Sequence, residues 1–517
     1  SNFLHLRRNE LYIHIPGGRR DCMSRHSLAL YWTVCSAVLS RLHCWTASAA
    51  ALQDDVTLLQ VSSRQHQKLQ EHHREYYWPV KNGDLLRTGY SPFLPSVDVS
   101  EEPSWTFTEP DNGVVRASPL IDEERNIYLS SLSGNVYKFA KNGTILWTYK
   151  DTVDRTPAVS AVWDGLLYAA DVTGQVFALH MANGSKLWQT KIACGCSPDT
   201  WSLTATAGVV VAGAVTDSQC DQFYSQNLPG RLWNDRIVAL DAKTGKVKWD
   251  FNLTQPTFNF LGAVKSGSLV FSDSLGMPFR LNLSTGAVIW KGARAGIQPW
   301  HLPVDTTGGS TIGRNNLIYT ASNAVPMSDP TTPWREGHLS AFNFETGALV
   351  WTKSLEYPAA TAAAIGPIGP AGRLGVVVGA GLAPNSPEDS MDIIIQSSYE
   401  KKLRIWALDA FTGATLWMHE PAPWHGVGRG DTAVPDHKCL PDAFGNPAIG
   451  GDGTTYIGDE SGHFYAILDK NGDGHIDPDE SEVVAHDMGA AFQGSPGLAP
   501  GMLVATPCNG MHVFLAN

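Results

Sequence analysis

Charged residues are scarce in this sequence: they make up 17% of its 517 residues, against roughly 25% in an average globular protein. Basic residues are the scarcer kind, with 38 Lys and Arg against 50 Asp and Glu, which gives a formal net charge of −12. A protein that binds nucleic acid needs a basic surface to neutralise phosphates. The composition therefore argues against a nucleic-acid partner.

Long apolar runs are also lacking. The most apolar stretch, residues 358–384, is interrupted by Pro, Gly and Arg373. A helix that crosses a bilayer needs about 20 apolar residues. We therefore expect no membrane span in the mature chain.

A shorter apolar run near the N-terminus has another meaning. Residues 28–39 follow the basic pair Arg25-His26 and precede the small residues Ala47-Ser48-Ala49, which is the pattern of a secretory signal. An uncleaved signal-anchor helix is the alternative.

This pattern predicts four segments. We expect residues 1–22 to be an upstream segment outside the working protein and residues 23–49 to be a signal peptide. The polar residues 50–77 are expected to form a linker or pro-segment, and residues 78–517 the folded domain.

The cysteines bear on disulfide pairing in such an exported protein. Five of the eight lie after the predicted signal, at Cys194, Cys196, Cys220, Cys439 and Cys508. In an oxidising compartment an odd number implies disulfides plus one leftover thiol. We expect Cys439 to pair with Cys508, and Cys220 with Cys194 or Cys196. Glycosylation sequons stand at Asn142, Asn183, Asn252 and Asn282.

Turn-forming and aromatic residues are abundant instead, with 49 Gly, 31 Pro and 17 Trp, and they recur in one unit. Each unit has Ser/Thr-Pro, short apolar strands separated by Gly turns, and a closing Trp; the first clear copy covers residues 118–147 and the second 156–188. The base period between tryptophans is about 41 residues, and alternating apolar residues bounded by Gly indicate strands. The closing tryptophans are Trp105, Trp147, Trp188, Trp249, Trp290, Trp351 and Trp417.

Four antiparallel strands per unit, repeated without helical periodicity, predict a propeller. A unit at residues 446–466 lacks its Trp, and a last unit at residues 495–514 supplies three strands only. The strand at Trp105 is expected to complete that last unit. The fold class is therefore all-β: an eight-bladed β-propeller of four-stranded antiparallel blades, closed by pairing of N- and C-terminal segments in one blade. The tryptophans are expected to pack between blades.

The repeat resembles the pyrroloquinoline quinone (PQQ) repeat of quinoprotein alcohol dehydrogenases. The strings VYKFAKNGTILW (136–147) and IWALDAFTGATLW (405–417) carry the resemblance. The opening residues 78–91 are similar to the first segment of such propellers, and the arrangement resembles the polyvinyl-alcohol-dehydrogenase-like branch. The resemblance covers residues 78–517. The same repeat also builds scaffold propellers without a quinone, such as the outer-membrane assembly lipoprotein of bacteria.

The resemblance implies an axial site. PQQ is a flat tricarboxylate that would need cations, an aromatic face and usually Ca²⁺. Residues just before each innermost strand converge on the channel, where they would bind such a ligand or merely hydrogen-bond water. The predicted ring is Arg116, Arg155, Asp199, Trp201, Trp300, His301, Asn446 and Gln493.

Two departures argue against the enzyme. Cys194 and Cys196 are separated by one residue, whereas many family dehydrogenases carry adjacent cysteines. There is also no Cys-x-x-Cys-His for an attached haem.

Residues 469–480 match a twelve-residue Ca²⁺ loop of EF-hand type at every ligand position, with Gly474 for the turn and Ile476 at position 8. Strands rather than helices are expected on both sides, which suggests a structural ion in a blade hairpin. A merely acidic surface turn is the alternative. The predicted ligands are Asp469, Asn471, Asp473, His475 through its carbonyl, Asp477 and Glu480.

Three functions fit these features. The first is a secreted PQQ-like propeller with a structural Ca²⁺, located outside the cell or in the secretory lumen (periplasmic in a bacterium). It would be a monomer acting as a binding or scaffold module, with a small-molecule or protein ligand at the axis. The second is a PQQ- and Ca²⁺-dependent alcohol dehydrogenase. The third, a hydrolase or lyase propeller, finds no nucleophile motif in its favour.

Overall fold

The computed structural model comprises two units, Ser1–His73 and Arg74–Asn517. In the first, β1 (Leu4–Arg7) and β2 (Glu10–Ile13) form an antiparallel hairpin. The predicted signal peptide and most of the predicted linker lie outside the described residues. The structure describes residues 4–7, 10–13, 76–110, 113–150, 160–171, 173–193, 202–216, 234–257, 260–274, 276–292, 309–324, 336–381, 400–426, 428–430 and 443–516.

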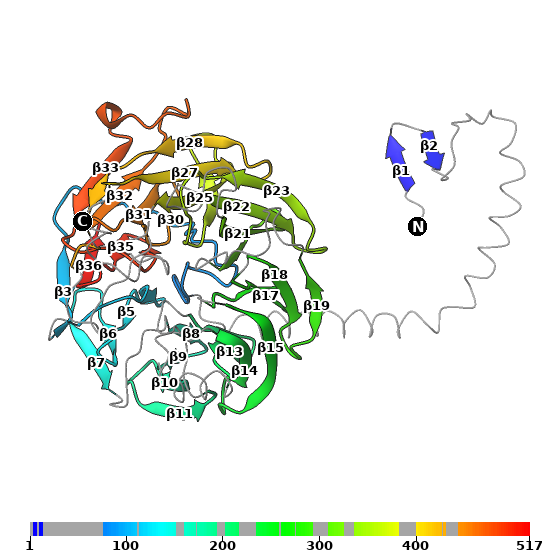
Figure 1. The fold of residues 1–517 in the computed structure, drawn as a ribbon, viewed down its shortest axis with the longest axis vertical. Coiled ribbons are helices and arrows are strands. Elements are labelled where there is room, and N and C mark those ends of the chain that lie inside the picture. Colours follow the sequence, from blue (N-terminus) through cyan, green and yellow to red (C-terminus); the bar gives the residue numbers. More distant parts are fainter. Residues whose placement is uncertain are drawn as a thin grey trace, which may run out of the picture. The chain divides into compact units, whose positions relative to one another are not determined.

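The second unit is built of eight four-stranded antiparallel sheets that surround a common centre (Figure 1). This confirms the prediction of an all-β, eight-bladed propeller. A 3₁₀ turn, η3, spans Pro478–Glu480. No helix long and apolar enough to span a membrane occurs among the described residues.

The first four blades follow one another along the chain, each with its strands in sequence order. Blade 1 is β4 (Leu120–Ile121), β5 (Ile127–Ser130), β6 (Asn135–Phe139) and β7 (Ile145–Lys150); blade 2 is β8 (Ala161–Trp163), β9 (Leu166–Ala170), β10 (Gln175–His180) and β11 (Lys186–Lys191); blade 3 is β12 (Thr204–Thr206), β13 (Val209–Ala214), β14 (Asn234–Asp241) and β15 (Val247–Thr257); blade 4 is β16 (Ala263–Lys265), β17 (Ser268–Ser272), β18 (Pro278–Asn282) and β19 (Val288–Lys291).

A two-stranded ribbon is present in addition to the eight blades: β26 (Glu400–Lys401) pairs with β29 (Trp424–His425). Blade 5 is β20 (Ser310–Ile312), β21 (Leu317–Ala324), β22 (Glu336–Asn343) and β23 (Leu349–Ser354); blade 6 is β24 (Ala364–Ile368), β25 (Arg373–Gly381), β27 (Leu403–Asp409) and β28 (Thr415–His419); blade 7 is β30 (Ala448–Ile449), β31 (Thr455–Gly458), β32 (His463–Ile467) and β33 (Val483–Asp487); blade 8 is β34 (Gly497–Ala499), β35 (Met502–Ala505), β36 (Gly510–Leu515) and β3 (Trp105–Thr108).

Burial along the strands explains their sequences. A second strand such as β13 is covered on both faces and is apolar or small throughout. A fourth strand such as β7 alternates between exposed and half-buried positions, because only one of its faces meets the next blade.

The tryptophans pack between blades as predicted. In six seams the Trp of one blade lies against a Gly in the turn between the third and fourth strands of the next blade, and its indole N–H donates to a carbonyl of that same turn. The pairs are Trp105 with Gly143, Trp147 with Gly184, Trp188 with Gly245, Trp249 with Gly286, Trp290 with Gly347 and Trp351 with Gly413.

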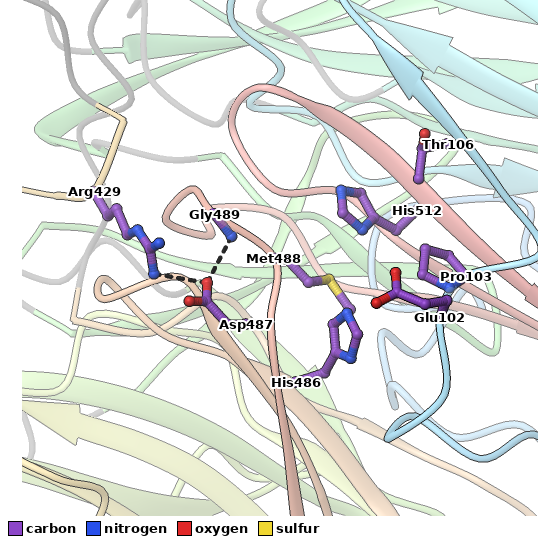
Figure 2. A pocket seen from close by; sticks show the side chains of 9 residues that line it. All are labelled: Glu102, Pro103, Thr106, Arg429, His486, Asp487, Met488, Gly489 and His512. Carbon is purple, nitrogen blue, oxygen red and sulfur yellow. Dashed lines mark hydrogen bonds and ion pairs between the residues drawn. The ribbon is translucent and has the colours of Figure 1, made fainter.

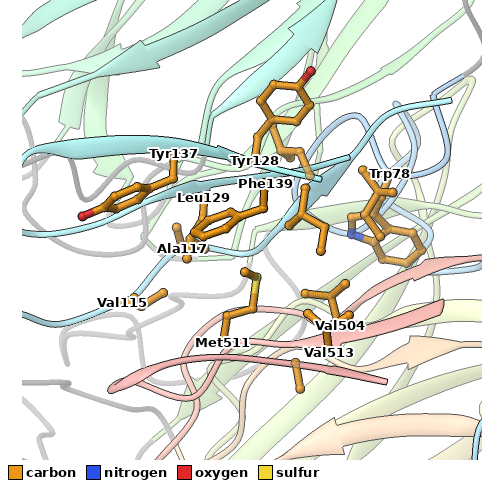
Figure 3. Close-up of a cluster of buried hydrophobic side chains, with 14 of the residues drawn as sticks. Trp78, Val115, Ala117, Tyr128, Leu129, Tyr137, Phe139, Val504, Met511 and Val513 are labelled. Atoms are coloured by element: carbon orange, nitrogen blue, oxygen red, sulfur yellow. The ribbon is translucent and has the colours of Figure 1, made fainter. Parts of the chain in front are cut away.

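Blade 8 combines distant parts of the chain. Strand β3 hydrogen-bonds to β36, with Trp105 opposite Val513. Buried side chains of β35 and β36 pack against those of blade 1 and against Trp78, which is fully buried (Figure 3). One continuous apolar cluster therefore joins blade 8, blade 1 and the segment that precedes β3.

Candidate functional site

The segment before β3 occupies the centre of the ring. Residues 76–95, here called the axial segment, lie in the middle of the propeller (Figure 1) and hydrogen-bond to the inner strand or hairpin of each blade in turn. These bonds are Trp78 N–H to Ile121 O (3.0 Å), Val162 N–H to Pro79 O (2.9 Å), Arg87 Nη2 to Leu203 O (2.9 Å), Val264 N–H to Leu85 O (2.6 Å), Ile312 N–H to Leu86 O (2.9 Å), Ile365 N–H to Thr88 O (2.7 Å), Ile449 N–H to Gly89 O (2.7 Å) and Gly501 N–H to Leu94 O (3.0 Å).

Arg87 is the main polar anchor of the axial segment. Its side chain is fully buried, and burial lowers the pKa of Arg87 to about 9. Its guanidinium donates to four acceptors on three segments of the chain, so four of its five N–H donors are used within the fold. They are Lys81 O (2.8 Å), Gly262 O (2.9 Å), Leu203 O (2.9 Å) and Thr204 Oγ1 (2.6 Å).

Asp84 lies beside this anchor. Burial raises the pKa of Asp84, while two hydrogen bonds from Thr88 act in the opposite direction. Thr88 donates through its backbone N–H and its hydroxyl, each at 2.9 Å. Asp84 therefore serves the turn of the axial segment.

Three members of the predicted axial ring are described, and all three are buried: Arg116, Asn446 and Gln493. Asn446 Nδ2 donates to Asn82 Oδ1 (3.1 Å), and Asn446 Oδ1 accepts from Ala362 N–H (2.9 Å). One end of the Asn446 amide therefore binds the axial segment and the other end binds the approach to blade 6, so that Asn446 connects the two.

Arg116 and Gln493 lie on neighbouring segments. Each stands two residues before a serine, Ser118 or Ser495, and these serines are bonded to each other: Ser495 N–H and Oγ lie 2.8 and 2.9 Å from Ser118 Oγ. This pair also meets the axial segment, because Asn82 N–H donates to Ser495 Oγ (3.3 Å).

The other five ring members lie outside the described residues: Arg155, Asp199, Trp201, Trp300 and His301. Of the two arginines and two tryptophans that would bind a quinone, only Arg116 is therefore placed. The ring stays a prediction.

The predicted Ca²⁺ loop stands between β32 and β33, as expected. Asp469 is buried, and its carboxylate accepts the N–H groups of Gly472 (2.7 Å) and Gly474 (3.1 Å). The Asn471 amide nitrogen lies 3.3 Å from Asp473 Oδ2 and 3.1 Å from Glu480 Oε2.

Two further ligand positions occupy the second half of the loop. Asp477 Oδ1 accepts the N–H of Asp479 (2.8 Å), and the His475 N–H donates to Asp473 Oδ1 (2.7 Å). The oxygen-rich donor set suits a hard cation such as Ca²⁺. Across the described residues, however, no three His, Cys, Asp or Glu side chains are placed together to hold a metal ion.

Glu482 is hydrogen-bonded to the backbone of the loop. It was not predicted from the sequence because it lies outside the twelve-residue motif. It is buried, and its carboxylate accepts the N–H groups of Lys470 (2.7 Å), Asn471 (3.2 Å) and Asp477 (3.0 Å). The Glu482 carboxylate therefore stabilises the backbone of the loop without an ion.

The loop also replaces the Trp-receiving turn of blade 7. Trp417 of blade 6 is buried in an apolar cluster against which Ile476 of the loop packs. A Cβ atom on Gly474 would lie 2.7 Å from the Leu416 carbonyl oxygen. The loop therefore packs against blade 6 and fills the contact between blades 6 and 7.

A buried ion pair on blade 7 was also missed. Glu460 is fully buried, and its Oε2 lies 3.5 Å from Lys401 Nζ. Burial raises the pKa of Glu460 to about 8, and Lys401 opposes that shift. Lys401 of β26 also donates to the carbonyl of Gly426, which follows β29, so its pair with Glu460 connects the β26–β29 ribbon to this blade.

Cys508 is buried and disulfide-bonded. All other cysteines lie outside the described residues, so the predicted pairing with Cys439 stays a prediction.

Comparison with known proteins agrees with this architecture. The family profile described as outer membrane protein assembly factor BamB matches residues 44–292 and 234–475. The chain belongs to this family of PQQ-like propellers.

Individual relatives are distant. Tetrathionate hydrolase of Acidithiobacillus ferrooxidans is 26% identical over 44% of this chain and 45% of its own length. Polyvinylalcohol dehydrogenase of a Sphingopyxis species is 25% identical over 66% of this chain and 51% of its own length. The chain spans about half the length of the curated relatives it matches.

Solved structures share the fold. BamB from Moraxella catarrhalis superposes with a TM-score of 0.51 at 18% identity, covering 80% of this chain and 97% of its own. The quinohemoprotein alcohol dehydrogenase from Comamonas testosteroni gives 0.57 at 12% identity, covering 85% and 80%.

Proposed function

We propose that this chain is a secreted, monomeric PQQ-like propeller that acts as a binding or scaffold module and carries a structural Ca²⁺. The observation that carries the proposal is the use of the polar axial groups within the fold. Arg87 and Asn446 donate to backbone and side-chain oxygens of the protein itself. A buried donor that is already paired has little left to offer a ligand.

A PQQ-dependent alcohol dehydrogenase is the second candidate, favoured by the similarity to polyvinylalcohol dehydrogenase. Arg116, with Arg155 and Trp201 or Trp300, would hold the quinone, which would supply the two-electron oxidation of an alcohol. The test is incubation with PQQ and Ca²⁺ followed by dye reduction with simple alcohols. No saturable PQQ binding and no turnover are expected. PQQ-dependent turnover that disappears in Arg116→Ala would overturn the scaffold proposal.

The proposed Ca²⁺ site calls for a pair of matched variants. Glu480 is exposed and takes one hydrogen bond, from Asn471, whereas Glu482 is buried and takes three from the backbone. Glu480→Gln should lower the melting temperature in Ca²⁺ and leave it unchanged in chelator, because the Gln amide oxygen can still accept the Asn471 bond and only the ion needs the negative charge. Glu482→Gln should lower it in both. An equal loss for Glu480→Gln in chelator and Ca²⁺ would mean that the loop binds no ion.

Secretion is supported by the disulfide-bonded state of Cys508, since disulfides persist in oxidising compartments. We expect the mature protein to begin near residue 50. N-terminal sequencing of the exported protein checks this; a product that retains residues 23–49 would contradict a cleaved signal.

A further inference from the structure

Polar side chains at the rim of the ring can be bonded within the fold even where they are exposed. In the open pocket between blades 7 and 8, the exposed Asp487 carboxylate accepts from Arg429 Nη1 (2.6 Å) and from the Gly489 N–H (2.9 Å) (Figure 2). A group that is already bonded has little to offer a second partner. A modification site on this surface therefore needs an exposed polar side chain that the fold does not use.

Three of the four glycosylation sequons begin at an Asn that serves a turn. Asn142, Asn183 and Asn282 each accept, through Oδ1, the N–H of the residue two positions later, at 3.2, 3.0 and 3.0 Å. In blade 3, Asp241 makes the corresponding bond with the N–H of Lys243 (3.2 Å). Because Asn and Asp both stabilise such turns, turn chemistry alone accounts for an Asn at these three positions.

Asn252 has no such role. It is the sixth of the eleven residues of β15, and both Asn252 and Thr254, which completes the sequon, are exposed. Side chains alternate along a strand, so these two share a face, while Phe251 on the other face contacts Phe279 of blade 4. Within the described part of the chain, neither the Asn252 nor the Thr254 side chain makes a hydrogen bond. The amide and the hydroxyl of this sequon are therefore both open to a modifying enzyme.

Asp250 gives this sequon a recognition feature that the other three lack. It stands two residues before Asn252 on the same exposed face of β15, whereas the other sequons have Ala, Met or Arg at that position. Oligosaccharyltransferases recognise Asn-x-Ser/Thr, and the bacterial enzymes also need an acidic residue two positions before the Asn. The ion pair of Asp250 with Arg236 is partly exposed and therefore weak. The Asn252 sequon thus suits a transferase of either kind.

The position of β15 gives a glycan something to cover. This strand is the outermost of blade 3, and within the described ranges no strand pairs with its outer side. Its eleven residues exceed the four to six of the other outer strands. A long unpaired edge can pair with another chain and start aggregation. A sugar at the middle of β15 would obstruct such pairing.

We propose that Asn252 carries an N-linked glycan that covers the free edge of β15. The proposal rests on the secretion proposed above, because the transferases act in the secretory lumen or the periplasm. Transfer from a lipid-linked oligosaccharide forms a bond between Asn252 Nδ2 and the anomeric carbon of the first sugar. The bond from that carbon to the lipid pyrophosphate breaks, and the departing pyrophosphate or the solvent takes the proton that Nδ2 loses.

The test expresses the full chain with its own N-terminus in cultured mammalian cells and maps the exported protein by peptide mass spectrometry. Peptide N-glycosidase converts a glycosylated Asn into Asp, so the Asn252 peptide should show this conversion in treated samples only. An exported chain in which Asn252 is unmodified would overturn this inference and leave secretion standing. A chain that stays inside the cell without a glycan would overturn secretion as well.

Two variants separate the glycan from the strand itself. Thr254→Ser preserves the sequon and should keep the glycan, whereas Asn252→Gln preserves a polar amide and should lose it. Both positions are exposed, so neither substitution should disturb folding. With the edge of β15 uncovered, Asn252→Gln should lose soluble protein on incubation relative to Thr254→Ser, as measured by light scattering. Equal solubility of the two variants would overturn the covering role of the glycan.

Discussion

Gly245 of blade 3 lies directly against the indole ring of Trp188 in blade 2: a Cβ atom on Gly245 would come within 2.6 Å of Trp188 Cε3 and 2.7 Å of Thr190 Oγ1. The backbone of Gly245 also has a positive φ of 69°. Gly245→Ala should therefore destabilise the protein by about 2–4 kcal/mol, through overpacking and left-handed backbone strain together. Urea unfolding measures this.

Gly208 provides the control for that substitution. Its φ is 74°, but a Cβ atom there would meet nothing within 4 Å. Gly208→Ala should cost only about 1 kcal/mol, the backbone contribution. Equal losses for the two variants would mean that packing against the tryptophan contributes nothing.

Arg87 joins the axial segment to blades 3 and 4 through buried hydrogen bonds. Arg87→Met should destabilise the protein by roughly 3–5 kcal/mol, because several buried carbonyls lose a charged donor. Thermal or urea unfolding checks it against Arg314→Met, which removes an exposed arginine near Asp84. A loss no larger than that of the Arg314 variant would show that the axial segment does not organise the ring.

Lys401 should matter more at high pH than at low pH. The pKa of Glu460 is raised above its usual value of 4.5 to about 8, so its neutral form contributes stability below pH 4.5 that is lost as the pH rises through 8. In Lys401→Met the ionised Glu460 would have no counter-charge. The variant should therefore lose more stability relative to wild type at pH 8 than at pH 5.

Urea unfolding at both pH values measures this difference. Lys402→Met is the control, since Lys402 is exposed. A loss that is the same at pH 5 and pH 8 would mean that Lys401 acts only through its bond to the Gly426 carbonyl.

His512 should make the protein sensitive to acid. Its folded pKa of about 4 lies below the usual 6.5, so the unfolded chain takes up a proton first. Stability is therefore lost as the pH falls from 6.5 to 4. The melting temperature of wild type should fall more over this interval than that of His512→Gln. Parallel curves would contradict the assignment.

The repeat made the fold predictable because each blade repeats one local rule: a tryptophan in its fourth strand and a glycine turn that receives it. The sequence also revealed that the unit at residues 446–466 lacks its Trp. The reason is visible only in three dimensions, since Val484 faces a blade with no such turn.

Side-chain partners were less predictable than strands. The acceptors of Arg87 at Leu203 and Gly262 lie 116 and 175 residues away, so no local pattern announces them. The spacing of the repeats predicted that Asn446 would lie near the axis. It did not predict that Asn82 and Ala362 would bond to the two ends of its amide. Glu460 of blade 7 and Lys401 of the β26–β29 ribbon also lie far apart in the sequence, so their pairing has no local signal either.

The pairing of β3 with β36 also sets the order of events during biosynthesis. These strands are separated by about 400 residues, which a ribosome adds in roughly 20–80 s. Until the last strand emerges, β3 and the first strands of the ring have unpaired edges that can bind other nascent chains. Chaperone dependence should therefore be concentrated in this interval and fall once β36 has emerged.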